Sequence, residues 1–267
     1  MQSQKKFQLT AAVLAAYALG TLALTLYLSQ SVHTASQLAL LSGSTKLPNM
    51  KSISDIPSRK QTFIDLLLPM IEEKNTALLQ LRGEVLQMQR QLRTGQALTH
   101  VQLRRLERLK QRYQIDDDDN ALSAEQSLDI LNRRVDIIPP SMVLAQAAAE
   151  SGWGTSRFAQ QAQNLFGQWC YSKGCGIVPA RRAAGARHEV RRFRGIEHAL
   201  NAYYRNINSH RAYREVRQKR AELRKAETPV TGNALITGLT QYSSRGQAYV
   251  DELAELIRYN RLGELDD

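Results

Sequence analysis

The sequence has few of the residues on which metal, redox and nucleotide chemistry depend. It contains two cysteines and five histidines among 267 residues, and the histidines do not have the spacing of metal ligands. It has no HExxH or CxxC motif and no glycine-rich phosphate-binding loop. We therefore expect no metal and no cofactor. Aromatic residues make up only 6% of the chain, whereas alanine, leucine, arginine and glutamine are frequent, which favours helices.

The chain is also short of acidic residues. Its 36 lysines and arginines outnumber 25 aspartates and glutamates, which gives a net charge of +11 and an isoelectric point near 9.8. Such a balance indicates an anionic partner: nucleic acid, lipid head groups or an acidic polymer. The acidic run at 116–119 lacks the glycine and the distal glutamate of a calcium loop, so we interpret it as a solvated loop.

An uncharged stretch near the N-terminus predicts a membrane anchor within residues 1–35. Two lysines precede the run 7–32, whose apolar centre at 9–28 is long enough to cross a bilayer. Because no comparable cluster follows the run, the N-terminus is expected in the cytoplasm and the remainder outside it. A signal peptide cleaved near residues 34–36 is the alternative. An extracytoplasmic location makes nucleic acid an unexpected partner.

Behind this anchor, the sequence predicts a linker and two helices. Residues 36–57 mix Ser, Gly, Pro and Lys without periodicity and predict the linker. Apolar residues at three- or four-residue steps predict helices at 60–93, with a kink or restart at Pro69, and at 98–113. We expect these helices to form a hairpin region, 58–120, that packs on the domain behind it. A membrane-proximal coiled coil that dimerises is the competing interpretation.

The domain expected at 121–267 is helical apart from one interruption. Between 168 and 194 helix signals vanish, and glycines and a proline separate short β-prone segments. We interpret 168–194 as a small β-hairpin lobe, in which Cys170 and Cys175 suit a short-loop disulfide if the compartment is oxidising. Helical patterns resume at residue 195. The predicted fold is therefore mainly α, in the α+β sense, with one β lobe.

The most informative stretch runs from 139 to 169. A proline pair followed by Ser141 marks a helix start, and residues 142–149 are so apolar that we expect this helix to be buried on most sides. Glu150 stands at its C-terminal end, before Gly152, which can stop a helix. The helix dipole and apolar surroundings both raise the pKa of Glu150, as a general acid requires. The ordinary alternative is a surface glutamate paired with a nearby arginine.

Two segments of this stretch resemble a known family, the N-acetylglucosaminidases of glycoside hydrolase family 73. The segments are AQAAAESGWGTSRFA and NLFGQWC, and the similarity continues through HEVRRF and YSSRGQAYVDEL, over roughly residues 58–262. The resemblance implies a lysozyme-like helical domain that cleaves the glycan strands of peptidoglycan, with Glu150 at the catalytic-acid position. With the predicted anchor, it implies a single-pass protein of the inner membrane whose C-terminal domain lies in the periplasm.

Glycoside cleavage needs a second group besides the acid, either a base or a nucleophile. The resemblance implies a carboxylate on the β lobe, and by position alone Glu189 is the candidate. Its alternative role is to balance neighbouring arginines on an exposed strand. If Glu189 faces away, the 2-acetamido group of the substrate can act as an internal nucleophile, positioned by a tyrosine. The family's essential tyrosine matches Tyr242 or Tyr249, and the spacing does not choose between them.

Several residues near Glu150 are candidates for substrate binding. Trp169, on the lobe, is the best candidate for stacking on a sugar ring, although tryptophan and phenylalanine more often belong to a core. Arginines on the lobe suit the free carboxylates of peptidoglycan stem peptides, with solvated surface as the default interpretation. The candidates are Trp153, Asn164, Phe166, Gln168, Trp169, Arg182 and Arg192.

Other functions stay open at the level of sequence. A muramidase or lytic transglycosylase on the same fold would share the acid but cut the other glycosidic bond or form an anhydro product. A non-catalytic cell-wall scaffold would need no acid at all. A membrane-surface binder of DNA or lipid would fit the charge, but it leaves the SGWG and NLFG motifs unexplained.

Overall fold

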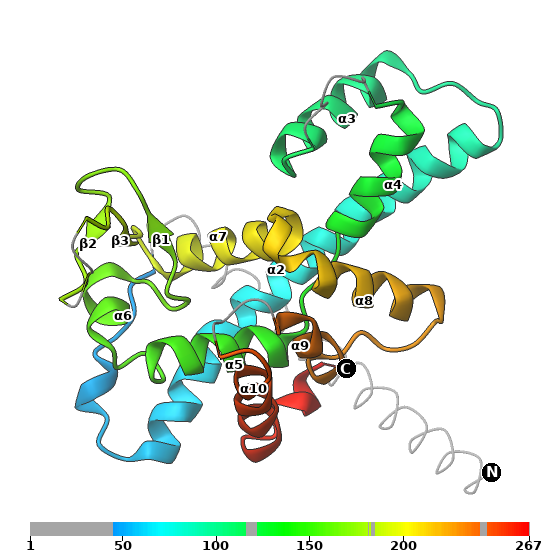
Figure 1. Cartoon of the computed structure of the whole chain (residues 1–267). Coiled ribbons are helices and arrows are strands. Elements are labelled where there is room, and N and C mark those ends of the chain that lie inside the picture. Colours follow the sequence, from blue (N-terminus) through cyan, green and yellow to red (C-terminus); the bar gives the residue numbers. More distant parts are fainter. Residues whose placement is uncertain (1–44, 116–121, 181, 183–184, 241–244, 267) are drawn as a thin grey trace, which may run out of the picture. The chain divides into compact units, whose positions relative to one another are not determined.

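Helices form most of the structure, and one small sheet interrupts them (Figure 1). The computed structural model describes residues 45–115, 122–180, 182, 185–240 and 245–266. From residue 46 onward the chain forms one compact unit. The elements in order are η1 (Met50–Ser52), α2 (Ile56–Arg93), α3 (His100–Arg112), α4 (Ala124–Arg134), α5 (Pro140–Ser151), α6 (Arg157–Ala162), β1 (Trp169–Cys170), β2 (Gly176–Ile177), β3 (Glu189–Arg191), α7 (Ile196–Ser209), η2 (Arg211–Tyr213), α8 (Arg214–Lys225), α9 (Gly232–Ile236), η3 (Thr237–Leu239), α10 (Gln247–Tyr259) and η4 (Leu262–Leu265). The predicted class, mainly α with a small β lobe, is confirmed.

Three of the predicted features lie outside the described residues: the anchor at 1–35, the acidic run at 116–119 and Tyr242. Within the described ranges, no helix is both long and apolar enough to span a membrane.

The longest helix, α2, begins earlier than predicted and is not interrupted at Pro69. Its start is fixed by Asp55, whose carboxylate accepts a hydrogen bond from the backbone N–H of Ser58 (2.8 Å). A proline inside a helix removes one backbone hydrogen bond. Leu67 and Ile71, on either side of Pro69, are fully buried. Their packing stabilises a helix that continues through Pro69, so the restart predicted there does not occur.

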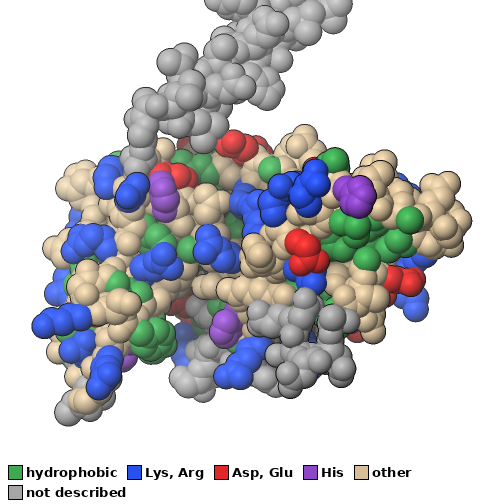
Figure 2. All heavy atoms as spheres, turned by 90° about the horizontal axis from the view of Figure 1, so that it is seen from above, with side chains coloured by type: hydrophobic (Ala, Val, Ile, Leu, Met, Phe, Trp, Pro, Cys, Tyr) green, Lys and Arg blue, Asp and Glu red, His purple; other side chains and the backbone are tan. Residues whose placement is uncertain are grey.

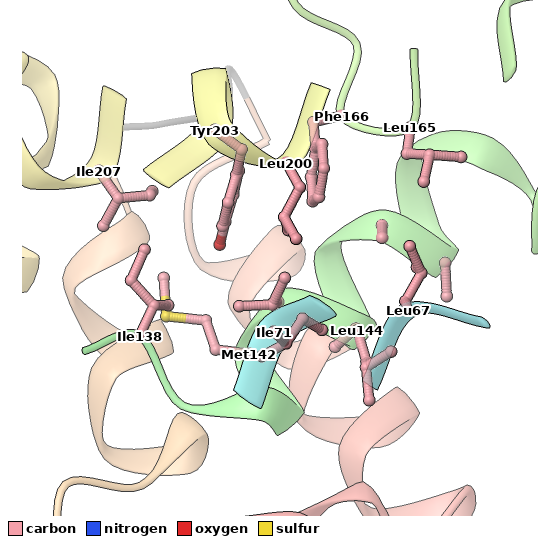
Figure 3. Close-up of a cluster of buried hydrophobic side chains, with 14 of the residues drawn as sticks. Leu67, Ile71, Ile138, Met142, Leu144, Leu165, Phe166, Leu200, Tyr203 and Ile207 are labelled. Atoms are coloured by element: carbon pink, nitrogen blue, oxygen red, sulfur yellow. The ribbon is translucent and has the colours of Figure 1, made fainter. Parts of the chain in front are cut away.

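Two separate clusters of buried apolar residues share α2. The first half of the helix, with Leu67 and Ile71, packs against α5 and belongs to the main core, to which α7 also contributes (Figure 3). The second half forms a smaller cluster with α3 and α4 around Val85 and Leu131. A helix of 38 residues is long enough to serve both clusters, and the domain boundary near residue 120 stays a prediction.

Part of the segment predicted as a linker, 36–57, is packed into the main core. Leu47 and Met50 are buried, and the backbone N–H of Leu47 donates to Oε1 of Gln163 (2.6 Å). The side chain of Met50 lies 2.8 Å from the position that a Cβ on Gly154 would take. Because Gly154 has no side chain, residues 47–50 can fill the space beside the turn after α5. The composition of 36–57 did not indicate that part of this segment packs into the core.

The predicted β lobe at 168–194 is present as a three-stranded antiparallel sheet in the order β1-β3-β2. Trp169 and Ile177 both lie opposite Val190, on either side of the central strand. Cys170 and Cys175 form the disulfide that their spacing suggested. Each strand has only two or three residues, so side chains and the disulfide must supply much of the order of the lobe.

Candidate active site

The helix that carries Glu150, α5, is buried along almost its whole length. Every residue from Pro140 to Ala148 is buried. It starts at the proline pair, as predicted, with Pro139 at the N-cap, but Ser141 lies inside the helix and no side chain caps its start. The backbone N–H and hydroxyl of Ser141 donate to the carboxylate of Asp266 (2.9 and 2.6 Å). A carboxylate near the C-terminal end of the chain therefore stabilises the N-terminus of α5.

Glu150 lies in the last turn of α5, which Gly152 ends in a left-handed conformation, as predicted (φ 56°). The side chain as a whole is exposed. Its Oε1 accepts a hydrogen bond from the hydroxyl of Tyr249 (3.0 Å), and its Oε2 lies 3.2 Å from the position of a Cβ on Gly167. Desolvation by the surrounding protein raises the pKa of Glu150, and the charge of Glu252 adds to this effect.

A chain of buried hydrogen bonds leads from the interior to Glu150. The hydroxyl of Tyr203 donates to Oε1 of Gln146 (2.6 Å), and Nε2 of Gln146 donates to the hydroxyl oxygen of Tyr249 (3.1 Å). Because this oxygen accepts from Gln146, the hydrogen of Tyr249 is directed at Glu150. The ring of Phe166 stacks on that of Tyr203 at 4.2 Å, and both rings lie in the core in Figure 3.

The second half of the site comes from α10. Tyr249, in its first turn, is the tyrosine candidate that contacts Glu150, whereas Tyr242 lies outside the described residues. Glu252 follows one turn later and forms an ion pair with Arg245 (2.6 Å). Hydrogen bonding from Tyr249 and the charge of Arg245 both lower the pKa of Glu150, so they oppose the larger effect of desolvation.

Both carboxylate oxygens of Glu189 are bound within the β lobe. The residue is buried, and its two oxygens accept the backbone N–H groups of Gly174 and Gly176 (2.9 and 2.8 Å). These two hydrogen bonds, followed by the charge of Arg182, lower the pKa of Glu189. The carboxylate thus orders the turn between β1 and β2, and a role as second catalytic carboxylate stays a prediction for Glu189. Strand alternation alone could not show which side it takes.

Among the described residues, one group of side chains has the proximity of metal ligands: Cys170, Cys175 and Glu189, within 4.8 Å of one another. The two sulfur atoms are joined in a disulfide, so neither is a thiolate ligand. This group is a structural element of the lobe.

Two of the predicted substrate-binding residues hold the backbone instead. The side chain of Asn164 donates to the carbonyls of Gln168 and Arg191 (2.8 and 2.9 Å) and accepts from the N–H groups of Phe166 and Gln168. This uses its whole hydrogen-bonding capacity. Gln168 donates to the carbonyl of Ala199 in α7 (2.9 Å). The two residues therefore join the NLFG turn to the lobe and to α7.

The aromatic candidates divide into core and surface. Phe166 is buried against Tyr203, and Trp153 packs edge-on against Phe63 at 5.6 Å. Phe166 is therefore a core residue, whereas Trp153 is half-buried and packs against the edge of the core. Trp169 is 55% exposed and stacks on the imidazole of His188 at 4.1 Å, so it keeps an open face for a ligand.

The two arginine candidates lie on the lobe and bind backbone carbonyls. Arg182 donates to the carbonyl of His188 (3.2 Å), and Arg192 donates to that of Gln161. Lys and Arg side chains are spread over the face seen in Figure 2, where Asp and Glu are fewer. Two cavities in the described part of the chain have volumes of about 490 and 280 Å³, and Glu150 lines neither of these two.

Sequence reasoning missed Gln146, Arg245 and Glu252, which act on Glu150 or on its partner Tyr249. Gln146 is the one polar residue between Met142 and Ala149 and stands four positions before Glu150, so helical spacing places both on one face. That pattern was a usable signal. No local signal marked Glu252, because its effect depends on the approach of α10 to α5.

The raised pKa of Glu150 suits acid catalysis, and comparison with known proteins defines the class. Residues 126–262, just over half of the chain, match the family model Glucosaminidase, described as mannosyl-glycoprotein endo-beta-N-acetylglucosaminidase, a class of glycoside hydrolase. The chain is 34% identical to Protein bax of Escherichia coli (strain K12) over 82% of its own length and 76% of that protein. The chain therefore belongs to the glucosaminidase family.

Among solved structures, the chain is similar to the catalytic domain of the autolysin Auto from Listeria monocytogenes. The match has 16% sequence identity and a TM-score of 0.43, and it covers 82% of this chain and 93% of that domain. This likeness is too low to establish a shared fold.

Proposed function

We propose that the protein is a peptidoglycan hydrolase, an endo-β-N-acetylglucosaminidase of lysozyme-like architecture with Glu150 as its general acid. The family match supports glycoside hydrolysis, and one observation carries the role of Glu150. Its carboxyl group has a raised pKa at the exposed end of a buried helix. A protonated carboxyl group can give its proton to the leaving oxygen of a glycosidic bond.

The hydrogen bond from Tyr249 suggests which oxygen of Glu150 is the donor. Oε1 already accepts the tyrosine hydrogen, so the acidic proton belongs on Oε2, beside the turn at Gly167. When the proton leaves, the carboxylate keeps the hydrogen bond from Tyr249, which is stronger to a charged acceptor. Gln146 holds the hydroxyl in this direction throughout the reaction.

For the second group, we propose that the 2-acetamido group of the substrate acts as an internal nucleophile. The binding of both oxygens of Glu189 within the lobe favours this route. A thiazoline analogue of N-acetylglucosamine, which mimics the cyclised intermediate, should then inhibit the enzyme competitively. Lack of inhibition would favour a carboxylate, and Glu252 would be the next residue to test.

The decisive experiment is digestion of purified sacculi by the full-length protein in detergent, followed by mass spectrometry. New reducing N-acetylglucosamine ends support the proposal. Reducing N-acetylmuramic ends indicate a muramidase, and anhydro-muramic ends a lytic transglycosylase. We expect Glu150→Gln to lower the rate by about 10²–10⁴-fold, as removal of a general acid does. Equal release by parent and variant would exclude Glu150 as the acid, and no release by the parent protein would indicate a non-catalytic scaffold.

We further propose that residues 1–35 anchor the protein in the inner membrane by a single pass, with the catalytic domain in the periplasm. The uncharged run at 7–32 supports this, and the Cys170–Cys175 disulfide suits an oxidising compartment. Protease added to spheroplasts should degrade the domain, and a domain that stays protected until lysis would exclude this topology.

A further inference from the structure

The larger cavity, of about 490 Å³, lies away from Glu150, between α2, the end of α3 and α7. Its volume is in the range of small-ligand sites. Ten described residues line it: Lys74, Leu78, Gln111, Arg112, Tyr113, Gln114, Asn201, Tyr204, Arg205 and Asn208. Nothing in the proposed hydrolytic reaction uses them.

Three cations meet at this cavity, and none of the described lining residues is acidic. They are Lys74, Arg112 and Arg205. Desolvation lowers the pKa of Lys74, the charges of Arg112 and Arg205 lower it further, and the charge of Glu73 opposes them. Nζ of Lys74 donates to Oδ1 of Asn201, which also lines the cavity (2.6 Å). The two arginines form no ion pair within the described part of the chain. An anionic ligand would relieve the repulsion between Lys74 and the two arginines.

The cavity also has a hydrogen-bond acceptor without a partner. Asn208 is 1% exposed, and its Nδ2 donates to the backbone carbonyl of Asp136 (3.0 Å), which fixes the orientation of the amide. Its Oδ1 is buried and accepts no hydrogen bond from the described residues. Such an atom is costly unless a ligand or water supplies a donor. A ligand with an N–H or O–H group as well as negative charge would satisfy Oδ1 once a small side-chain shift opens it to the cavity, because this oxygen has almost no accessible surface in the structure.

We propose that this cavity binds a short peptide with free carboxylates. The carboxylates would form ion pairs with Arg112, Arg205 and Lys74. A peptide N–H would donate to Oδ1 of Asn208. The carboxamides of Gln111 and Gln114 suit the remaining peptide groups. This inference rests on the proposed function. For a peptidoglycan hydrolase, the peptide is the stem peptide of peptidoglycan. Helix α7 would then serve both sites, since Tyr203 contacts Gln146 beside Glu150 and Tyr204 lines the cavity.

The test is calorimetric titration of the full-length protein in detergent with the pentapeptide L-Ala-γ-D-Glu-L-Lys-D-Ala-D-Ala. We expect one saturable site. The double variant Arg112→Gln/Arg205→Gln should weaken the Kd at least about tenfold, because both carboxylate partners are lost. The matched control is Arg108→Gln/Arg211→Gln, which removes two exposed arginines outside the cavity and should change the Kd less than about twofold.

Two further titrations separate peptide recognition from simple charge. The same peptide with all carboxylates amidated should bind at least about tenfold more weakly. Inorganic phosphate at equal concentration should not displace the pentapeptide, and if it does, the cavity is a general anion site and the proposal is overturned. Equal affinity of parent and double variant, or no binding to the parent, also overturns it.

Binding and catalysis can fail independently in these measurements. Glu150→Gln should keep the Kd for the pentapeptide while it loses release of sacculus fragments. Peptide binding by a protein that never cleaves glycan would disprove the proposed hydrolase but leave the binding site intact. Glycan cleavage without peptide binding would disprove only the site.

Discussion

At the scale of single residues, the chemistry depends on the protonation of Glu150, and its neighbours act on that proton in opposite directions. Desolvation and the charge of Glu252 raise the pKa of Glu150, whereas the hydrogen bond from Tyr249 and the charge of Arg245 lower it. The balance keeps the group an acid while giving its carboxylate a partner after proton transfer. Replacement of one neighbour should therefore shift the pH dependence of activity, in the direction set by the effect of that neighbour on the pKa of Glu150.

We predict opposite shifts for Tyr249→Phe and Glu252→Gln. Activity requires protonated Glu150, so it falls as the pH rises through the pKa of Glu150. Tyr249→Phe removes a hydrogen bond that lowers this pKa, and the basic limb of the kcat/KM profile should move to higher pH. Glu252→Gln removes a charge that raises it, and the limb should move to lower pH. Shifts in the same direction would contradict the assignment of Glu150 as the acid.

A control for these variants is Glu255→Gln, in the next turn of α10. Glu255 is exposed and pairs with Arg258 (2.7 Å), and it has no part in the pKa of Glu150. Its pH profile on the same sacculus preparation should overlay that of the parent protein.

At the scale of elements, the β lobe is ordered by polar side chains that bind backbone, since its strands are too short to bury a core of their own. Asn164 fixes the NLFG turn to β3, and Glu189 fixes the turn that holds the disulfide. The position of this turn matters for catalysis because Gly167 lies against Oε2 of Glu150.

We predict that Asn164→Ala destabilises the protein by about 2–4 kcal/mol, because it leaves buried backbone groups without partners. The carbonyls of Gln168 and Arg191 lose their donor, and two N–H groups lose their acceptor. Urea unfolding at constant m-value measures the change. Asn206→Ala is the matched control, since its amide makes only one 3.5 Å contact, and it should cost less than about 0.5 kcal/mol. Equal stability of the two variants would refute this account.

At the scale of the whole molecule, a buried cluster of charges joins the two cores. Asp136, in the segment before α5, pairs with Arg82 of α2 (3.4 Å) and with Arg224 of α8 (2.9 Å). Arg220 of α8 is 1% exposed and donates to the carbonyl of Ile137 (2.7 Å). Burial alone would raise the pKa of Asp136, but the three arginines together lower it. The cluster thus fixes α2 and α8 against the start of α5.

We predict that Asp136→Asn lowers the free energy of unfolding by about 3–5 kcal/mol near neutral pH, because it leaves Arg220 buried without its counter-charge. The folded pKa of Asp136 lies below its ordinary value of 3.8, so its contribution is complete above that value and is lost as the pH falls through the lowered pKa. Parent and variant should therefore converge in stability at strongly acidic pH. Asp251→Asn, which removes an exposed carboxylate on α10, is the control and should change stability little.

The sequence by itself determined the features that depend on near neighbours along the chain. The apolar run before Glu150 predicted a buried helix, Gly152 predicted its end, and the loss of helical periodicity after 168 predicted the lobe with its disulfide. Such features follow from backbone preferences and periodicity over a few residues, which the tertiary structure here left unchanged.

Only the tertiary structure decided which distant groups meet. It brought Tyr249 to Glu150 across 99 residues and Asp266 to Ser141 across 125. It turned both oxygens of Glu189 into the lobe and packed Met50 into the core. The physical reason is that these contacts form when whole helices bury their apolar faces together, and the polar partners at their edges follow from that packing. No local pattern encodes such a choice.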